Sequence, residues 1–589
     1  MGIGVIMIDY FNPFEYETAN KLSEEKICDF YIEDYNYSRF IRSKRNIFLV
    51  GARGTGKTMT LLFNSLPVQI YKAKKKNRGL DLSFVCIHIP CNTTLIHKKE
   101  YQLIKEFQAE VVSEHFLVVS IMYELVDNMS KVPDLLDGIN IKTLIEEIEF
   151  SFDVDFPQKD DFFKGLKLII QKEVKKAQQL LNSYEDDNFS YPPALSFSSG
   201  VLPLVTCLRN IPALSQTHFA LMLDDAHDLN LYQVKAMNSW VAYRDNTIFS
   251  FKVALAKVDQ PTHITRSGGA ILEGHDYTQI DMDQAYHNKY ASFGKLARGI
   301  IEKRLSKIDI NVEPEKFFPL HRQFKNDLKQ CEEDVRVEAE SKYGSNQRKI
   351  GDHIYKYARA KYFKDRSKSK SNLPPYSGFD ILVHISTGVI RNLLDPCYWM
   401  YDALVSEIHA SSGDISSIKE IPPNVQREVI LDRSKRKWEW IEDGLSNSIE
   451  GCSLEEGKYI YQLFDQLAIL FRNRLLFHES EPRAVTFTIS DKKSEHYPAL
   501  IELLNKAKKS QILYTYRSSA KDSGSRETYY VPNRILLPER GLDPHGQHAR
   551  VSLKSSVLWE AAINNKEIPL SAKNKVKEYD NQRKLWDKI

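Results

Sequence analysis

The sequence predicts an α/β fold class, with a parallel-sheet core containing a helical insertion, a second helical region, and a C-terminal winged-helix-like domain. A chain of 589 residues needs several hydrophobic cores, so several domains are expected. Three observations support this fold: a glycine-rich turn inside an apolar-then-helical stretch at residues 46–65, further continuous apolar runs at 82–90, 219–223 and 248–256, and an alternating pattern that follows a helical one after residue 497.

The glycine-rich turn matches a phosphate-binding loop. Residues 51–58 read GARGTGKT, which fits G-x-x-x-x-G-K-[ST] between a strand and a helix, as this motif requires. Glycines let backbone N–H groups turn toward a phosphate, and the helix N-terminus adds partial positive charge. Lys57 is expected to bridge the β- and γ-phosphates, and Thr58 to bind Mg²⁺. The predicted cofactors are ATP and Mg²⁺, held by Gly51, Ala52, Arg53, Gly54, Thr55, Gly56, Lys57 and Thr58.

A later apolar run ends in the carboxylates that such a site needs. Residues 219–223 are continuously apolar, as in a strand covered on both faces, and Asp224 and Asp225 follow directly. We expect Asp224 to organise Mg²⁺ and Asp225 to orient or deprotonate the attacking water, so both join Lys57 as catalytic candidates. An aspartate reaches less far than the more usual glutamate, so hydrolysis is expected to be slow. The run at 248–256 follows at a spacing that favours a parallel sheet.

Two stretches of the chain are interpreted as helical. Residues 96–200 place apolar side chains at three- and four-residue spacing and are interpreted as an insertion into the core. These helices either pack on their own domain or form a platform for a partner. Residues 291–370 are also helical and heavily charged, with a basic run at 361–371 that we interpret as a solvated loop.

The C-terminal region has the layout of a winged helix. A helical pattern at residues 497–513 is followed by an alternating run, a glycine-bearing turn and a second alternating run. Residues 504–534 contain seven basic residues against two acidic ones, which suits contact with duplex DNA. A role as a protein–protein adaptor stays open. The nucleic-acid candidates are Lys506, Lys508, Lys509, Arg517 and Arg526.

Bulk composition excludes several classes of protein. Apolar residues make up 42% of the chain, but no apolar run is long enough to span a bilayer, so no membrane segment is expected. The first residues lack a basic, cleavable signal, and the seven cysteines form no CxxC pair, which indicates a reduced, cytoplasmic protein without a zinc site. A net charge of +3 is too small to indicate a partner by itself.

A further stretch carries a family resemblance. Residues 386–394, STGVIRNLL, resemble the second-sensor helix of AAA+ ATPases of the origin-recognition and cell-division-cycle type. This resemblance implies an AAA+ core with a helical lid, from which Arg391 contacts the γ-phosphate as a further catalytic residue. The stretch RSGGAILEGHDYTQIDMD at residues 266–283 is similar to bacterial members of this group, which are associated with mobile elements and phage defence.

The same resemblance implies a homo-oligomer in which one subunit inserts an arginine into the site of the next. Arg244, a catalytic candidate, and Arg266 are the residues to test for this role. One feature departs from the family pattern. The end of the run at 248–256 lacks the expected Asn, Ser or Thr of a first sensor, since Lys257 and Asp259 occupy that region.

The expected domains are a linker at 1–45, the nucleotide-binding core at 46–290 with its insertion at about 96–200, the lid at 291–410, a helical connector at 411–476, the winged-helix-like domain at 477–560 and a charged tail at 561–589. The expected function is an ATP-hydrolysing switch that assembles on double-stranded DNA, on a separate effector protein, or on both, as part of a prokaryotic anti-phage defence system. Two alternatives stay open: a replication or transposition initiator, and a weakly hydrolysing, nucleotide-dependent protein scaffold.

Overall fold

Five parallel strands form one sheet in the order β2-β3-β4-β1-β5. They are β1 (Ile47–Gly51), β2 (Phe84–Pro90), β3 (His218–Asp224), β4 (Phe249–Ala256) and β5 (Thr278–Asp281). The central strands β1, β3 and β4 are buried along their whole length, which explains why their sequences are continuous apolar runs. The predicted α/β class with a parallel sheet is confirmed.

The register brings the carboxyl ends of the strands to one edge of the sheet. Gly51 of β1 lies opposite Ala256 of β4, and Pro90 of β2 lies opposite Asp224 of β3. Because all five strands are parallel, the residues that follow each of them emerge at this same edge. This edge is where the phosphate-binding loop leaves β1.

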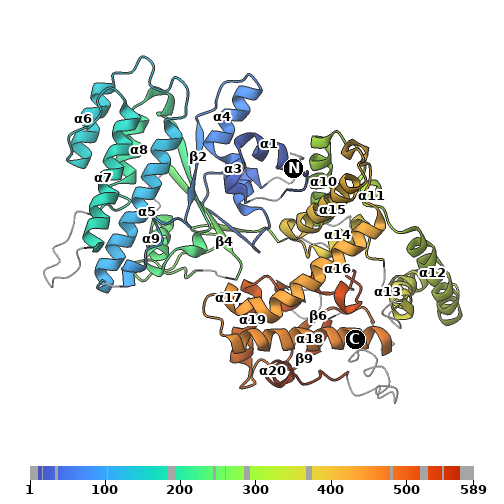
Figure 1. Cartoon of the computed structure of the whole chain (residues 1–589). Helices are drawn as coiled ribbons and strands as arrows, with labels where there is room; N and C mark the ends of the chain where they lie inside the picture. The colour runs from blue at the N-terminus through green and yellow to red at the C-terminus, as the bar shows by residue number, and fades with distance from the viewer. Residues whose placement is uncertain are drawn as a thin grey trace, which may run out of the picture. The chain divides into compact units, whose positions relative to one another are not determined.

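The two faces of the sheet bury different side chains, because successive side chains along a strand point to opposite faces. Phe48 and Val50 of β1 belong to one apolar cluster, together with α5 and α9, whereas Ile47 and Leu49 pack with Leu61 on the other face. The helices of this part are α1 (Glu24–Phe30), α2 (Ser38–Ile41), α3 (Lys57–Asn64), α4 (Leu66–Lys75), α5 (Glu106–Met129), α6 (Ile141–Phe152), α7 (Phe162–Asn182), α8 (Val201–Arg209) and α9 (Leu231–Ala242). Figure 1 shows α5 to α8 gathered as a bundle beside β2. Helices α5 to α7 lie within the helical insertion predicted at about 96–200, and α8 directly follows it.

The computed structural model divides into two compact units: the core unit, Glu17–Asp283, and the C-terminal unit, Gln284–Ile589 with Met1–Tyr16. It describes residues 11–15, 18–33, 37–102, 104–182, 194–242, 247–258, 261–283, 292–366, 375–477, 482–517, 528–546 and 550–570. Within these residues, no helix combines the length and the apolar character needed to cross a membrane.

The C-terminal unit is mostly helical before its small sheet. Its helices are α10 (Ser292–Leu305), α11 (Pro314–Phe317), α12 (Arg322–Tyr343), α13 (Gln347–Arg366), α14 (Phe379–Ile385), α15 (Ile390–Ala410), α16 (Pro423–Glu439), α17 (Leu445–Ser448), α18 (Leu454–Phe477), α19 (Tyr497–Lys509) and α20 (Ser555–Asn564). Phe14 from the chain start packs against Phe317 and Phe318 here, so this early segment lies with the C-terminal unit.

A four-stranded sheet follows the helices, in the order β7-β8-β6-β9. The strands are β6 (Thr486–Ile489), β7 (Leu513–Arg517), β8 (Thr528–Pro532) and β9 (Arg550–Leu553). Strands β7 and β8 form the predicted antiparallel hairpin directly after α19, and α18, α19 and α20 pack together. This arrangement is consistent with the winged-helix-like region that the sequence predicts. The sequence analysis did not identify β6 and β9.

Candidate nucleotide site

The predicted phosphate-binding loop connects β1 to α3. Gly54 and Gly56 have φ angles of +86° and +95°, a left-handed conformation that favours glycine. At Gly51 a Cβ atom would come within 2.9 Å of Thr55 Oγ1, so a side chain at this position would clash with the first turn of the loop. Helix α3 begins at Lys57 with no acidic residue in its first turn. Its N-terminal N–H groups therefore present partial positive charge to an anion.

Lys57 is buried beneath this loop. Its Nζ donates to the carbonyl oxygens of Gly51 at 2.9 Å and Ala52 at 3.0 Å. Burial lowers the pKa of Lys57, although the carboxylates of Asp225, Asp283 and Asp224 favour its charged form. The ammonium group is thus folded back on the loop, close to the acidic groups at the sheet edge.

The structure brings Asp224 together with Thr58, the two predicted metal ligands. Asp224 is only 1% exposed, and its carboxylate accepts from the backbone N–H of Asp225 at 3.0 Å. The Thr58 hydroxyl is near enough to this carboxylate to lower its pKa. His88 Nε2, from the end of β2, lies 3.1 Å from the same carboxylate. Burial by itself would raise the pKa of Asp224, but these hydrogen bonds lower it. Asp224 is therefore held as an ionised carboxylate beside a hydroxyl, a donor pair of the kind that Mg²⁺ binds.

Asp225 has the opposite electrostatic character. Burial, together with the nearby charges of Asp224 and Asp228, raises the pKa of Asp225 to about 6. Its backbone is left-handed, with φ of +52°, and its carboxylate accepts from Asn92 Nδ2 at 3.2 Å. Two adjacent carboxyl groups whose pKa values are pushed apart suit one metal ligand and one proton acceptor.

An ion-pair network supports the base of the loop, and the sequence analysis did not anticipate it. Asp283, just after β5, accepts from the Ala52 N–H at 2.8 Å and pairs with Lys257 Nζ at 2.7 Å. Asp281 also pairs with Lys257, at 3.0 Å, and Lys257 N–H donates to the Gly51 carbonyl. Burial opposes the charge on Lys257, but the two carboxylates raise its pKa. Lys257 thus occupies the end of β4, where a first-sensor residue was expected.

Three residues here were missed in the sequence, namely His88, Asn92 and Asp283, and Lys257 was noted only as a departure from the family pattern. Each follows, or lies near the end of, a strand whose neighbour in the sheet is far away in the sequence. The only signal available was position, because His88 and Asn92 lie at and just after the end of the apolar run at 82–90, and IDMD ends the stretch at 266–283.

The arginines predicted to act at the nucleotide site belong to different parts of the chain. Arg53 extends from the loop, half exposed, with its guanidinium 3.3 Å from His227 Nε2. Arg391 belongs to the C-terminal unit, where it is exposed in the first turn of α15. Arg266 donates from Nε to Glu110 at 2.7 Å and also pairs with Glu114. Arg244 lies outside the described residues.

The nucleic-acid candidates lie at the end of α19 and on the hairpin. Lys506 is paired with Glu456 of α18, whereas Lys508 is partly exposed and Lys509 is exposed. Arg517 is the last residue of β7, and Arg526 lies outside the described residues. Arg534, which contributes to the positive charge of this segment, is buried rather than presented at the surface.

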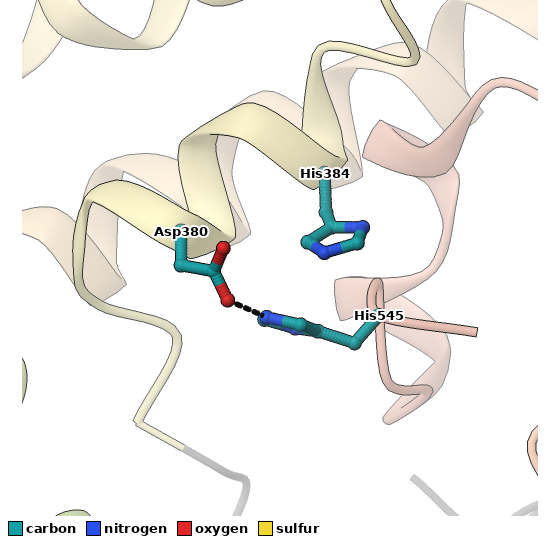
Figure 2. A group of neighbouring side chains, drawn as sticks. All are labelled: Asp380, His384 and His545. Atoms are coloured by element: carbon teal, nitrogen blue, oxygen red, sulfur yellow. Dashed lines mark hydrogen bonds and ion pairs between the residues drawn. The ribbon is translucent and has the colours of Figure 1, made fainter. Parts of the chain in front are cut away.

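A second polar cluster lies where α14 meets the loop before β9. Asp380 and His384, one helical turn apart, point toward His545, and His545 Nε2 hydrogen-bonds the Asp380 carboxylate (Figure 2). Arg359 donates to His545 Nδ1 from 2.9 Å, and Arg534 lies 3.2 Å from His384 Nδ1.

The hydrogen-bond roles in this cluster decide between a metal site and a polar junction. A guanidinium can only donate, so an arginine donor faces each Nδ1 atom, and His545 Nδ1 also lies 3.4 Å from the Asp543 carboxylate. Burial lowers the pKa of His384 well below its usual range, which agrees with a neutral ring. With an arginine beside each ring and both nearby carboxylates already paired, Asp380 with His545 and Asp543 with Arg359, the arrangement favours a hydrogen-bonded junction over a metal site.

The fold and the site together define the class of protein. A five-stranded parallel sheet in this order, with a phosphate-binding loop after β1 and an acidic end on β3, is the core of an AAA+ nucleotide-binding protein. The chain belongs to the ORC-CDC6-like family, whose model matches residues 12–337 and 320–553. Members of this AAA+ family are generally nucleotide-binding ATPases.

Solved structures similar to this chain include three archaeal proteins of low identity. The Aeropyrum pernix ORC2 protein, solved as ADPNP and ADP complexes, is 10% identical, with 92% of each chain covered and a TM-score of 0.29. The Aeropyrum pernix ORC1 protein in complex with DNA is 10% identical, with 84% of this chain and 86% of that chain covered and a TM-score of 0.27. Cdc6p from Pyrobaculum aerophilum is 11% identical, with 94% and 97% covered and a TM-score of 0.28. A search of curated proteins found no match.

Proposed function

We propose that this chain binds ATP with Mg²⁺ at the loop after β1, hydrolyses it slowly, and uses the ATP-bound state to assemble on duplex DNA or on a partner. The observation that carries this proposal is the buried, ionised Asp224 carboxylate, which lies near the Thr58 hydroxyl and beside Asp225, whose pKa is raised to about 6. A metal ligand pair next to a proton acceptor, at the mouth of a phosphate-binding loop, suits phosphoryl transfer to water.

Each residue has a defined task in this mechanism. The backbone N–H groups of the loop and of α3 bind the phosphates, and Lys57 exchanges its two carbonyl partners for phosphate oxygens. Thr58 and Asp224 hold Mg²⁺, which neutralises charge on the phosphates. Asp225 accepts a proton from the attacking water. Arg391 contacts the γ-phosphate from the lid, and Arg244 or Arg266 completes the site of a neighbouring subunit.

The ATP-binding proposal is tested by comparing the wild type with Lys57→Ala and with Lys74→Ala, which removes an exposed lysine of α4. Affinity for ATP and turnover should fall in Lys57→Ala and stay unchanged in Lys74→Ala. Mass photometry on the same samples, with and without ATP-Mg²⁺, measures assembly. Equal ATP affinity in wild type and Lys57→Ala would refute the site.

DNA is the partner that family membership favours. In that setting the chain acts as an initiator-type DNA-binding ATPase, and Lys508 and Lys509 contact phosphates from the end of α19. A footprint confined to one sequence would support an initiator, whereas sequence-independent, strongly salt-sensitive binding would support a sensor. ATP-dependent assembly that ignores DNA would instead support the nucleotide-dependent scaffold.

The anti-phage role, with a homo-oligomer that acts through a separate effector protein in the cytoplasm, is a further hypothesis that rests on the resemblance of residues 266–283. Its test is phage plating on the native host with and without the gene for this chain. Equal plating would refute it and leave the ATPase proposal intact. Using Arg266 as the trans-acting residue would break its ion pairs with Glu110 and Glu114.

A further inference from the structure

The turn that leads into Arg391 has an unfavourable backbone conformation. Helix α14 ends at Ile385 and α15 begins at Ile390, and between them Thr387 and Gly388 have φ angles of +54° and +78°. A β-branched residue such as Thr387 avoids the left-handed region, so it stays there only when its surroundings hold it. Thr387 is completely buried.

The groups that hold this turn come from the C-terminal sheet. Tyr516 of β7 donates its hydroxyl hydrogen to the Thr387 carbonyl at 3.0 Å, and the Arg534 backbone N–H donates to Thr387 Oγ1 at 3.0 Å. Asn392, next to Arg391, donates from Nδ2 to the Tyr514 hydroxyl at 3.0 Å. Tyr514 and Tyr516 are two positions apart on β7 and therefore share a face of the strand. One strand thus contacts the chain both before and after Arg391.

The preceding helix is fixed on the same region. The Asp380 side chain, in the first turn of α14, hydrogen-bonds His545 (Figure 2). His384, in the last turn of α14, has its Nδ1 3.2 Å from the Arg534 guanidinium. With both ends of α14 and the following turn attached to residues 514–545, the start of α15 cannot rotate without breaking these hydrogen bonds. Arg391 is itself an exposed side chain, so its direction is set by the backbone on which it stands.

We propose that Tyr516 and Tyr514 are positioning residues for Arg391, through which the C-terminal sheet sets how the lid arginine meets the γ-phosphate. This inference rests on the proposed function, in which Arg391 contacts that phosphate. Neither tyrosine touches nucleotide; both act by fixing the turn at residues 386–389. The consequence is that hydroxyl groups of the C-terminal sheet tune the preference of the protein for ATP over ADP.

The test is the ratio of ATP to ADP affinity, measured with the full chain by equilibrium binding of both nucleotides. Tyr516→Phe keeps the ring and its stacking on Tyr529 but removes the hydroxyl. Losing one such hydrogen bond should lower the ATP/ADP affinity ratio about fivefold while leaving ADP affinity unchanged. Arg391→Ala should lower the ratio at least as much. The double variant should lose no more than Arg391→Ala alone, because both changes act through one group.

Tyr530→Phe is the matched control, since it removes a hydroxyl from the neighbouring strand, where the ring stacks on Phe487. An unchanged ratio in Tyr516→Phe, with a loss in Arg391→Ala, would overturn the inference and leave the proposed function standing. An equal loss in Tyr530→Phe would mean general loosening of the sheet and would also overturn it. If Arg391→Ala leaves the ratio unchanged, Arg391 does not contact the γ-phosphate, and both proposals for this residue fail.

Discussion

The raised pKa of Asp225 predicts that Asp225→Asn inactivates the protein and stabilises its nucleotide-free fold. Burial and the charges of Asp224 and Asp228 raise this pKa from its ordinary value near 3.8 to about 6. Ionising the group in the folded state therefore costs free energy at neutral pH. An amide keeps an oxygen to accept from Asn92 Nδ2 and removes the charge.

The magnitude follows from the shift in pKa. A shift of about two units corresponds to about 3 kcal/mol at 1.36 kcal/mol per unit. Because the group is only partly buried, solvent screening reduces this to about 1–2 kcal/mol. The sign follows from proton binding: between pH 4 and 6 the folded state binds more protons than the unfolded state, so wild-type stability falls as pH rises through this window. The gain from Asp225→Asn should be complete above pH 6 and should shrink toward zero at pH 4.

The assay is urea unfolding of the nucleotide-free protein at several values between pH 4 and 7.5, beside ATP turnover. Asp137→Asn, an exposed carboxylate of the same unit, is the matched control. Turnover of the wild type should rise with pH through about 6, and Asp225→Asn should lower it at least about a hundredfold. If Asp225→Asn is no more stable than wild type at pH 7.5, or differs from it equally at both ends of the range, the electrostatic argument is wrong.

Three other predictions address the metal, the loop and DNA. Asp224→Asn should remove the Mg²⁺-dependent part of ATP affinity and lower turnover about a hundredfold, measured by titrating Mg²⁺ against nucleotide binding; an unchanged Mg²⁺ dependence would rule Asp224 out as a ligand. Asp283→Ala leaves the Ala52 N–H without its carboxylate acceptor and should weaken ATP binding about tenfold by equilibrium titration, whereas Asp283→Asn, which keeps an oxygen there, should lose less. Replacing Lys508 and Lys509 by glutamate should weaken duplex binding and reduce the slope of log K against log salt by about 1.8, and an unchanged slope would place the DNA contacts elsewhere.

Local sequence was sufficient to predict the position of the proposed phosphate-binding loop, because consecutive backbone groups of the loop and the first turn of the next helix form it. Residues 51–58 place the glycines and the lysine that the loop needs, although Asp283 and Lys257 also hydrogen-bond the loop from distant parts of the sequence. The buried strands could also be predicted from the sequence, because a strand covered on both faces must be continuously apolar. Observed bounds differ from the predicted ones by a residue or two, as with β2, which begins at Phe84 rather than residue 82.

Other features of the site have no local signature. Lys257 and Asp283 contact each other across the end of β1, and His88 reaches Asp224 from a strand 136 positions earlier in the sequence. In the sequence, a lysine or a histidine after an apolar run gives the same pattern whether its side chain contacts a carboxylate or solvent in the folded protein. Only the order of the strands, with β4 between β3 and β1, decides which strand ends become neighbours.

The sequence by itself therefore determined the position of the glycine loop, the acidic strand end and the α/β class, since each depends on consecutive residues or on a local pattern of apolar side chains. The tertiary structure alone decided that Arg534 is buried, that Asp225 differs in pKa from its neighbour, and that Thr387 rests against Tyr516. Burial, electrostatic coupling and buried hydrogen bonds depend on distances between side chains. Such distances between residues far apart in the sequence are set by the packing of the strands and helices that carry them.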